Sequence, residues 1–260
     1  MSETLSSHVS NTGTSRACTP TTCAPSPLDA IPHPRITATA ATRQHRFRSR
    51  IGVGLAGGFY PAPHRYELYL SARCPLSLRV SITLDLLGLK DSVATTLLAL
   101  PADTPRAFSS LRSAYEATWH HYDGPLTAPA LCDRWSGRVV SNHTPDILRD
   151  LADLLTDRAG SCHSPLRPSA LAADIDALRD LLDRDVTPGA LPERRSAALD
   201  LLDRQLASGP YALGEDLTAA DVDLWVALAP LEAAGDLSSY AFLRDYVRRL
   251  DAHPAFRRHL

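Results

Sequence analysis

The chain has 260 residues, of which 44% are hydrophobic and 22% charged, and its formal net charge is −2 at pH 7. This length is enough for one large or two small domains with a substantial core, and the near-neutral charge argues against nucleic acid or an anionic membrane as a partner. No apolar run could span a membrane, the N-terminus lacks the pattern of a secretory signal, and five cysteines without regular spacing predict no disulfide framework. We therefore expect a protein of the reducing cytoplasm.

Residues 1–46 are rich in Ser, Thr, Pro and Ala and lack hydrophobic periodicity, so we expect a disordered tail. Cys18 and Cys23 lie in it without the second pair that a zinc site needs, and we expect no metal there. A small basic run lies at its end, which fits a solvated linker better than an arginine clamp on an anionic ligand: Arg43, Arg46, Arg48 and Arg50.

The segment around Cys74 predicts a strand followed by a helix. Residues 66–71 alternate between apolar and polar side chains, as in a half-buried strand. Apolar residues then recur at helical spacing over 76–89, and Pro75 suits the first turn because its missing N–H costs nothing there. Cys74 is thus expected at the N-terminus of a helix.

This position favours thiol chemistry at Cys74. The helix dipole and the unpaired N–H groups stabilise a thiolate. Two arginines, Arg73 and Arg79, add positive charge nearby. The alternative is that Cys74 is a small buried hydrophobic residue, which is the usual role of a lone cysteine.

A hairpin that begins with proline follows. Pro129 precedes a short apolar strand, a turn over 133–137 leads to a second strand at 138–141, and Thr144 is the expected N-cap of the next helix. With a further strand at 93–100, the order strand, helix, strand, hairpin, helix predicts an α/β thioredoxin-like domain. In that fold Pro129 holds a cis peptide bond that faces the cysteine, and a cis bond costs little before proline.

The second half of the chain predicts helices only. A linker with Gly, Ser and Pro covers 159–169, and Thr218 and Asp221 form a capping box at the start of a later helix. Helical periodicity marks four segments: 169–184, 192–207, 219–233 and 238–250. We therefore expect three regions: a disordered tail at 1–46, a thioredoxin-like thiol-binding domain at 47–158, and an all-α C-terminal domain at 169–260.

Other side chains leave two interpretations open. Tyr115, Trp119 and Tyr122 could line an aromatic pocket, although packing onto the core is the more usual role of aromatic residues. Cys132 follows the short apolar strand and is expected in the core, whereas Cys162 lies in the linker.

Three segments carry a family resemblance: 58–75, 111–115 together with 122–129, and 140–147. They resemble, in turn, the approach to the catalytic cysteine, the insertion before the cis-proline, and the segment that binds the γ-glutamyl end of glutathione in the glutathionyl-hydroquinone reductases. These enzymes are the xi class of the glutathione transferases and are related to the omega class. The resemblance covers about residues 57–257 and weakens after residue 158.

The resemblance implies a glutathione transferase fold, in which an α/β thioredoxin-like domain precedes an all-α domain. It also implies that Cys74 is the nucleophile, that glutathione is the cosubstrate, and that the reaction reduces conjugates of the glutathionyl-hydroquinone type. Backbone groups of Ala128 would hold the peptide part of the thiol, and Thr144 would hold its carboxylate. The expected binding residues are Arg79, Ala128, Pro129, His143 and Thr144.

The chain departs from the family pattern at several points. Leu76 stands where tryptophan is common, and His143 replaces a glutamate that would hold the amino group of glutathione. The tyrosine-bearing segment of the acceptor pocket is missing between 231 and 240. Lys90 stands alone against 26 arginines, a bias typical of GC-rich genomes, and some GC-rich bacteria use mycothiol. Mycothiol is therefore kept as the alternative thiol.

Two other functions fit the same residues. One is conjugation or isomerisation with a bound thiol in a biosynthetic pathway, and the other is a non-catalytic descendant of the fold that binds ligands. The expected partners are a small thiol and a small aromatic or quinone-type substrate, while a homodimer is left open.

Overall fold

The computed structural model describes residues 47–52, 58–72, 74–98, 105–155 and 165–258, and all of these belong to one compact unit. We call the described residues up to 155 the α/β part and those from 165 onward the helical part. The predicted tail and Cys18, Cys23, Arg43, Arg46, Arg73 and Cys162 lie outside the described residues. The predicted domain bounds at 46, 158 and 169 stay predictions.

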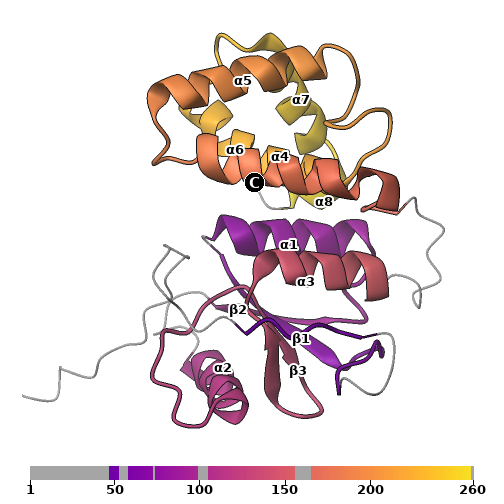
Figure 1. Cartoon of the computed structure of the whole chain (residues 1–260), viewed down its shortest axis with the longest axis vertical. Helices are drawn as coiled ribbons and strands as arrows, with labels where there is room; N and C mark the ends of the chain where they lie inside the picture. The colour runs from indigo at the N-terminus through magenta and orange to yellow at the C-terminus, as the bar shows by residue number, and fades with distance from the viewer. Residues whose placement is uncertain (1–46, 53–57, 73, 99–104, 156–164, 259–260) are drawn as a thin grey trace, which may run out of the picture. The chain divides into compact units, whose positions relative to one another are not determined.

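The α/β part is built on a mixed sheet with the strand order β2-β1-β3-β4. β1 pairs in parallel with β2 and antiparallel with β3, and β3 pairs antiparallel with β4. Helices α1 and α3 cover one face of the sheet and α2 covers the other (Figure 1). The bounds are β1 (Tyr66–Ser71), α1 (Pro75–Leu86), β2 (Ala94–Leu98), α2 (Pro105–Thr118), β3 (Ala130–Asp133), β4 (Arg138–Ser141) and α3 (Thr144–Asp150).

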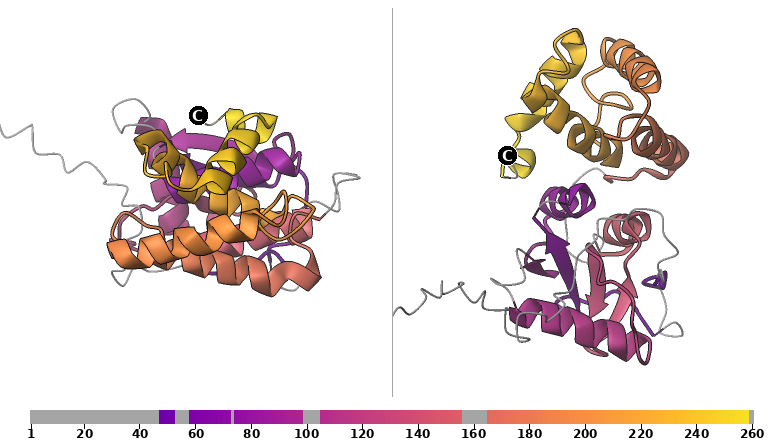
Figure 2. Two further views of the ribbon diagram at one scale, coloured as in Figure 1. Left: turned by 90° about the horizontal axis from the view of Figure 1, so that it is seen from above. Right: turned by 90° about the vertical axis from the view of Figure 1, so that its left-hand side faces the viewer.

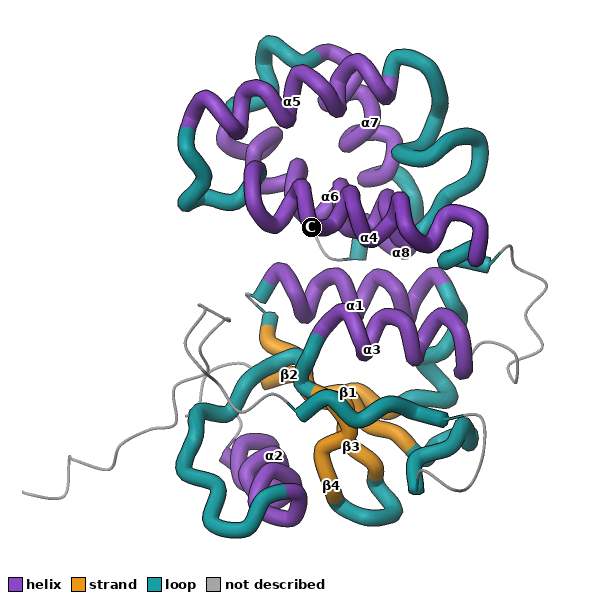
Figure 3. Tube along the Cα trace, in the orientation of Figure 1, coloured by secondary structure: helices purple, strands orange, loops and turns teal. Residues whose placement is uncertain are grey.

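The helical part follows a short π-helical extension of α3, η3 (Leu151–Leu155). It begins with a 3₁₀ turn, η5, and contains five described helices (Figure 3). Their bounds are η5 (Ser169–Leu171), α4 (Ala172–Asp185), α5 (Pro192–Leu206), α6 (Ala219–Ala234), α7 (Ala241–Asp251) and α8 (Pro254–Arg257).

Helix α1 joins the two parts because it is buried on both sides. It packs on β1 below and on α6 and α8 above (Figure 2). One hydrophobic cluster therefore runs from Leu68 of β1 through Val80 of α1 to Trp225 of α6, and each of these side chains is fully buried. A second cluster, which includes Leu111 and Tyr115 of α2, covers the opposite face of the sheet.

Most of the predicted elements are confirmed, one helix was not predicted, and one expected N-cap is wrong. The strands at 66–71 and 138–141 have the predicted bounds, and Ala128-Pro129 is a cis peptide bond. No helix was predicted over α2. The N-cap of α3 is His143 and not Thr144, because His143 has the extended backbone and Thr144 is already helical.

The capping box at the start of α6 is confirmed and is part of a larger buried network around Asp221. Its carboxylate accepts the N–H and the hydroxyl of Thr218 at 2.8 and 3.2 Å, the N–H of Ala212 at 2.7 Å and the hydroxyl of Tyr246 at 2.8 Å. Burial raises the pKa of Asp221 above its ordinary value, although these hydrogen bonds act in the opposite direction. One side chain thus fixes the start of α6, the preceding loop and α7.

We expect Asp221→Ala to lower the free energy of unfolding by about 2–4 kcal/mol, because it leaves several buried donors without an acceptor and removes a helix cap. Urea unfolding measures the loss. Asp216→Ala, at an exposed position of the same loop, is the control and should change the free energy by less than about 0.5 kcal/mol. Equal stability of the two variants would contradict the central role of Asp221.

Candidate active site

Cys74 occupies the N-cap position of α1, where the backbone is extended and Pro75 begins the helix. Its side chain is buried, and Sγ lies 3.6 Å from the carbonyl oxygen of Ala128, to which the thiol donates. The structure therefore brings the predicted cysteine to the cis-proline loop, 54 residues away in sequence.

The cis-proline loop is held from behind by Tyr115 of α2. The Tyr115 hydroxyl and the Thr127 Oγ1 are 2.8 Å apart, and Asn142 Nδ2 donates to both oxygens at 3.2 and 3.1 Å. Burial raises the pKa of Tyr115, although hydrogen bonds with Thr127 and Asn142 lower it in part, so the phenol keeps its proton. This polar cluster fixes the loop that faces Cys74.

Of the two interpretations left open for the aromatic residues, packing holds for Tyr115 and Tyr122. Both are buried, their rings are 4.9 Å apart, and both contact the ring of Phe47. Trp119 is exposed. Cys132 lies in the core as predicted, and burial raises the pKa of its thiol far above the ordinary value.

A cavity of about 840 Å³ opens between the α/β part and the helical part, a size typical of small-molecule sites. Cys74, His143 and Thr144 line it on one side, and Val186 and Leu231 are among the residues of the opposite side. Ala128 and Pro129 do not line the cavity. They adjoin two residues that do, because Thr127 precedes Ala128 and Cys74 contacts the Ala128 carbonyl.

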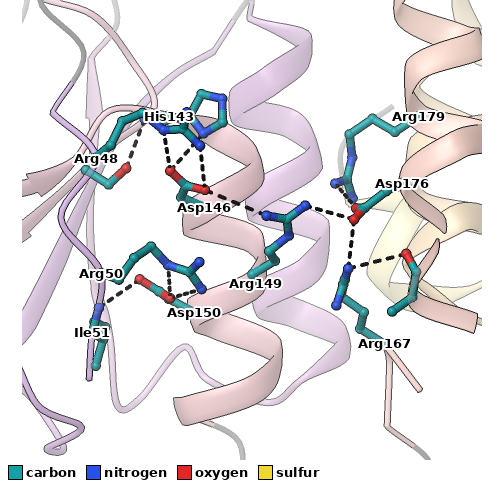
Figure 4. A network of polar contacts seen from close by, with 12 residues as sticks. Arg48, Arg50, Ile51, His143, Asp146, Arg149, Asp150, Arg167, Asp176 and Arg179 are labelled. Atoms are coloured by element: carbon teal, nitrogen blue, oxygen red, sulfur yellow. Dashed lines mark hydrogen bonds and ion pairs between the residues drawn. The ribbon is translucent and has the colours of Figure 1, made fainter. Parts of the chain in front are cut away.

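His143 is held by an ion-pair cluster at the start of α3. Its Nδ1 lies 2.9 Å from Asp146 Oδ2, and the same carboxylate accepts Arg48 Nε at 2.8 Å, while Arg149 approaches to 3.9 Å (Figure 4). Burial raises the pKa of Asp146, but hydrogen bonding to Arg48 and the charge of His143 lower it more, so the carboxylate stays ionised at neutral pH. Both described arginines of the basic run are paired with acids, because Arg50 Nε donates to Asp150 at 2.6 Å.

Thr144 is buried at the cavity wall. Neither its hydroxyl nor its N–H makes a hydrogen bond to any residue that the structure describes. Thr144 is the first residue of α3, where the N–H has no acceptor within the helix. Pro145 follows and has no N–H of its own. Thr144 thus offers two donors to a ligand in the cavity.

Arg79 is a buried residue of the cavity lining and belongs to an ion-pair network. Its Nη2 donates to Asp183 at 2.7 Å and its Nε lies 3.4 Å from Asp223, which also accepts Arg179 Nε at 2.9 Å. Burial lowers the pKa of Arg79, but the charges of Asp223 and Asp183 raise it more, so the guanidinium stays charged. The network ties α1 to α4 and α6, and Arg149 ties α3 to α4 through Asp176 at 2.8 Å.

Sequence reasoning missed the half of the cavity that the helical part supplies. These residues lie after α4, in α5 and near the end of α6, and only the packing of the helices brings them together: Val186, Thr187, Pro188, Arg195, Pro230, Leu231 and Asp236. Thr127 and Asn142 were missed as well, although they flank residues that the sequence did indicate. Within the described ranges there is no cluster of three or more potential metal ligands. None of the described helices is long and apolar enough to cross a membrane.

Comparison with known proteins agrees with this architecture. The family model "Glutathione S-transferase, C-terminal domain" matches residues 168–260. Glutathionyl-hydroquinone reductase YqjG of Escherichia coli is 26% identical over 232 residues, which cover 73% of this chain and 70% of the relative. PcpF of Sphingobium chlorophenolicum, with the same enzyme name, is 28% identical over 157 residues, 55% of this chain and half of that protein.

Solved structures show the same fold. The xi glutathione transferase of Phanerochaete chrysosporium has a TM-score of 0.67 at 26% identity, over 86% of this chain and 83% of its own. YqjG with glutathione bound has a TM-score of 0.70 at 23% identity, over 88% and 87%. The predicted glutathione transferase fold is therefore confirmed. Over most of its length the chain is similar to the xi-class glutathione transferases and to the glutathionyl-hydroquinone reductases, at 26–28% identity.

We expect Arg79→Leu to destabilise the protein by about 3–5 kcal/mol, because it leaves the carboxylate of Asp223 buried with one partner fewer. Urea unfolding measures the loss. Arg184→Leu is the control, since Arg184 is exposed and should contribute less than about 1 kcal/mol. The double variant Arg79→Leu/Asp223→Asn should recover part of the loss. A single variant as stable as the control would show that the buried pair is dispensable.

Proposed function

We propose that the protein is a glutathione-dependent reductase that uses Cys74 to remove the thiol from conjugates of the glutathionyl-hydroquinone type. The observation that carries this proposal is the place of Cys74 at the start of α1, 3.6 Å from the carbonyl beside the cis-proline and at the wall of a cavity. The names of the two curated relatives support the same substrate class.

The α/β domain, at 47–158, binds the thiol in this proposal, and the helical domain, at 169–260, supplies the acceptor side. Backbone groups of Ala128 beside Pro129 hold the peptide part of glutathione. The hydroxyl and N–H of Thr144, which no described residue engages, donate to its γ-glutamyl carboxylate. His143 faces the same end of the ligand, and Arg79 lines the cavity near Cys74 with its charge largely balanced by Asp183 and Asp223.

The reaction proceeds by thiol exchange in two steps. The Cys74 thiolate attacks the sulfur of the conjugate, the bond between sulfur and the aromatic carbon breaks, and the carbon takes the electron pair and a proton. The hydroquinone leaves, and Cys74 is left in a mixed disulfide with glutathione. A second glutathione, as its thiolate, attacks this disulfide, so glutathione disulfide forms and the Cys74 thiolate returns.

A second small thiol is needed because Ser77 stands where a Cys-x-x-Cys motif would place a resolving cysteine. Cys132 is buried in β3 and does not line the cavity. Glutathione is the proposed thiol, on the strength of the relatives' names and of the glutathione-bound structure of YqjG. Mycothiol is the alternative thiol. An exchange assay that compares the reaction of Cys74 with glutathione disulfide and with mycothiol disulfide distinguishes the two.

We expect Cys74→Ser to lower the turnover of a glutathionyl-hydroquinone by about 1,000-fold or more, because a hydroxyl is a poor nucleophile at neutral pH. The assay follows release of the hydroquinone, and mass spectrometry follows the glutathione adduct on Cys74. Cys132→Ala should keep most of the activity and form the same adduct. Turnover by Cys74→Ser at the wild-type rate would exclude this mechanism.

We expect Thr144→Val to weaken glutathione binding about 3–10-fold, the effect of losing one hydrogen bond to a charged group, because valine has the same shape without the hydroxyl. Titration calorimetry in the Cys74→Ser background measures binding without exchange. Thr95→Val, on the exposed face of β2, makes the same change away from the cavity and should leave the affinity unaltered. Unchanged affinity in Thr144→Val would remove this residue from the thiol site.

A further inference from the structure

Three arginines line the cavity, and two of them are neutralised by carboxylates. Arg79 is paired with Asp183 and Asp223, and Arg179 is paired with Asp223 and Asp176. Their charges therefore stabilise the junction between α1, α4 and α6, and they leave little net field for a ligand.

The third arginine, Arg195 near the start of α5, is different. No carboxylate of the described residues lies within 4 Å of its guanidinium. Its Nη2 instead donates to the carbonyls of Thr187 and Pro188, at 2.9 and 3.1 Å, in the loop that follows α4. Its Nε is buried without a partner among the described residues, and its Nη1 makes no hydrogen bond to them. Two carbonyls thus orient the guanidinium without neutralising it.

The surroundings of Arg195 suit an aromatic ring with a charged substituent. Val186, Pro188, Pro230 and Leu231 supply apolar wall on this side of the cavity. Apolar walls exclude water and strengthen the attraction between unlike charges. Among the described lining residues on this side, Asp236 also has no ion-pair partner, but it is exposed on the turn after α6 and is therefore better screened by water.

We propose that Arg195 selects the acceptor: it binds an ionised oxygen, a carboxylate or a phenolate, on the aromatic ring of the conjugate. This inference rests on the proposed reductase function and adds the substrate class. An arginine fork matches a carboxylate and cannot lose its charge at physiological pH. The apolar walls then receive the ring, and the sulfur of the conjugate is presented toward Cys74.

The test compares two conjugates that differ in one group: an unsubstituted glutathionyl-hydroquinone and its ring-carboxylated counterpart. Arg195→Gln is the informative variant, because glutamine keeps an NH₂ that can donate to the Thr187 and Pro188 carbonyls but has no charge. We expect kcat/KM for the carboxylated conjugate to fall about 10–100-fold, the loss of a charge-assisted hydrogen bond, and that for the neutral conjugate by less than about 3-fold. The kcat/KM of Arg195→Lys for the carboxylated conjugate should lie between the values of wild type and Arg195→Gln. Arg194→Gln, at the exposed neighbouring position, should change neither value.

A third conjugate separates the two sources of negative charge. A chlorinated glutathionyl-hydroquinone has a hydroxyl that ionises near neutral pH, so the Arg195→Gln effect should appear only above the pKa of that phenol. An effect on both the neutral and the carboxylated conjugate of equal size would overturn the proposal, since it would show a structural role for Arg195. A change confined to the KM for the second glutathione would also overturn it, because Arg195 would then bind the thiol.

Turnover tests the reductase function, and binding tests the selection by Arg195, so the two can be decided separately. If wild type turns over neither conjugate, the reductase function is wrong, and the inference is then decided by titration calorimetry with the two conjugates. Tighter binding of the carboxylated conjugate that Arg195→Gln abolishes would support the selection by Arg195. Equal affinity of wild type and Arg195→Gln for it would refute the selection.

Discussion

The buried charge of Arg79 is the constraint on which the arrangement of the cavity depends. A guanidinium this deep must be paired, and its partners Asp183 and Asp223 come from α4 and α6. Helix α1, whose N-cap is Cys74, is therefore fixed against both helices of the helical part. These ion pairs fix Cys74 relative to the helical side of the cavity, while the apolar contacts between α1 and α6 supply the bulk of the burial.

The cis-proline loop beside Cys74 is fixed independently, from the opposite face of the sheet. Tyr115 of α2 reaches Thr127 and Asn142, and these three side chains hold the loop that ends in the cis-proline. A fully satisfied polar cluster of this kind specifies one geometry, because any displacement leaves a buried group without a partner. The insertion between β2 and β3 therefore has a role in the site even though it does not line the cavity.

Features that depend on neighbouring residues in the chain could be predicted from the sequence, whereas features that depend on packing between distant helices could not. Pro75 and the alternation over 66–71 sufficed to place Cys74 at a helix start, because both are contacts between neighbours in the chain. Helix α2 also had a local signal, with Phe108, Leu111 and Tyr115 on one face, but no helix was predicted there because the segment was compared only with an insertion. The helical side of the cavity had no such signal. Its residues belong to α4, α5 and α6, and their approach is set by packing that no short window contains.

The replacement at His143 has a physical meaning that the sequence alone did not show. The imidazole does not stand alone in the place of a carboxylate, because Asp146, one turn of helix further on, holds its Nδ1 at 2.9 Å. Arg48 and Arg149 also contact that carboxylate, so most of its negative charge is neutralised within the cluster. An ammonium group at this end of the cavity therefore meets an imidazole that is backed by a compensated acid. The attraction for an ammonium group is weaker here than a free carboxylate would give. Under the proposed function, the choice of thiol then depends more on the groups that Thr144 and Ala128 bind than on the charge of the ammonium.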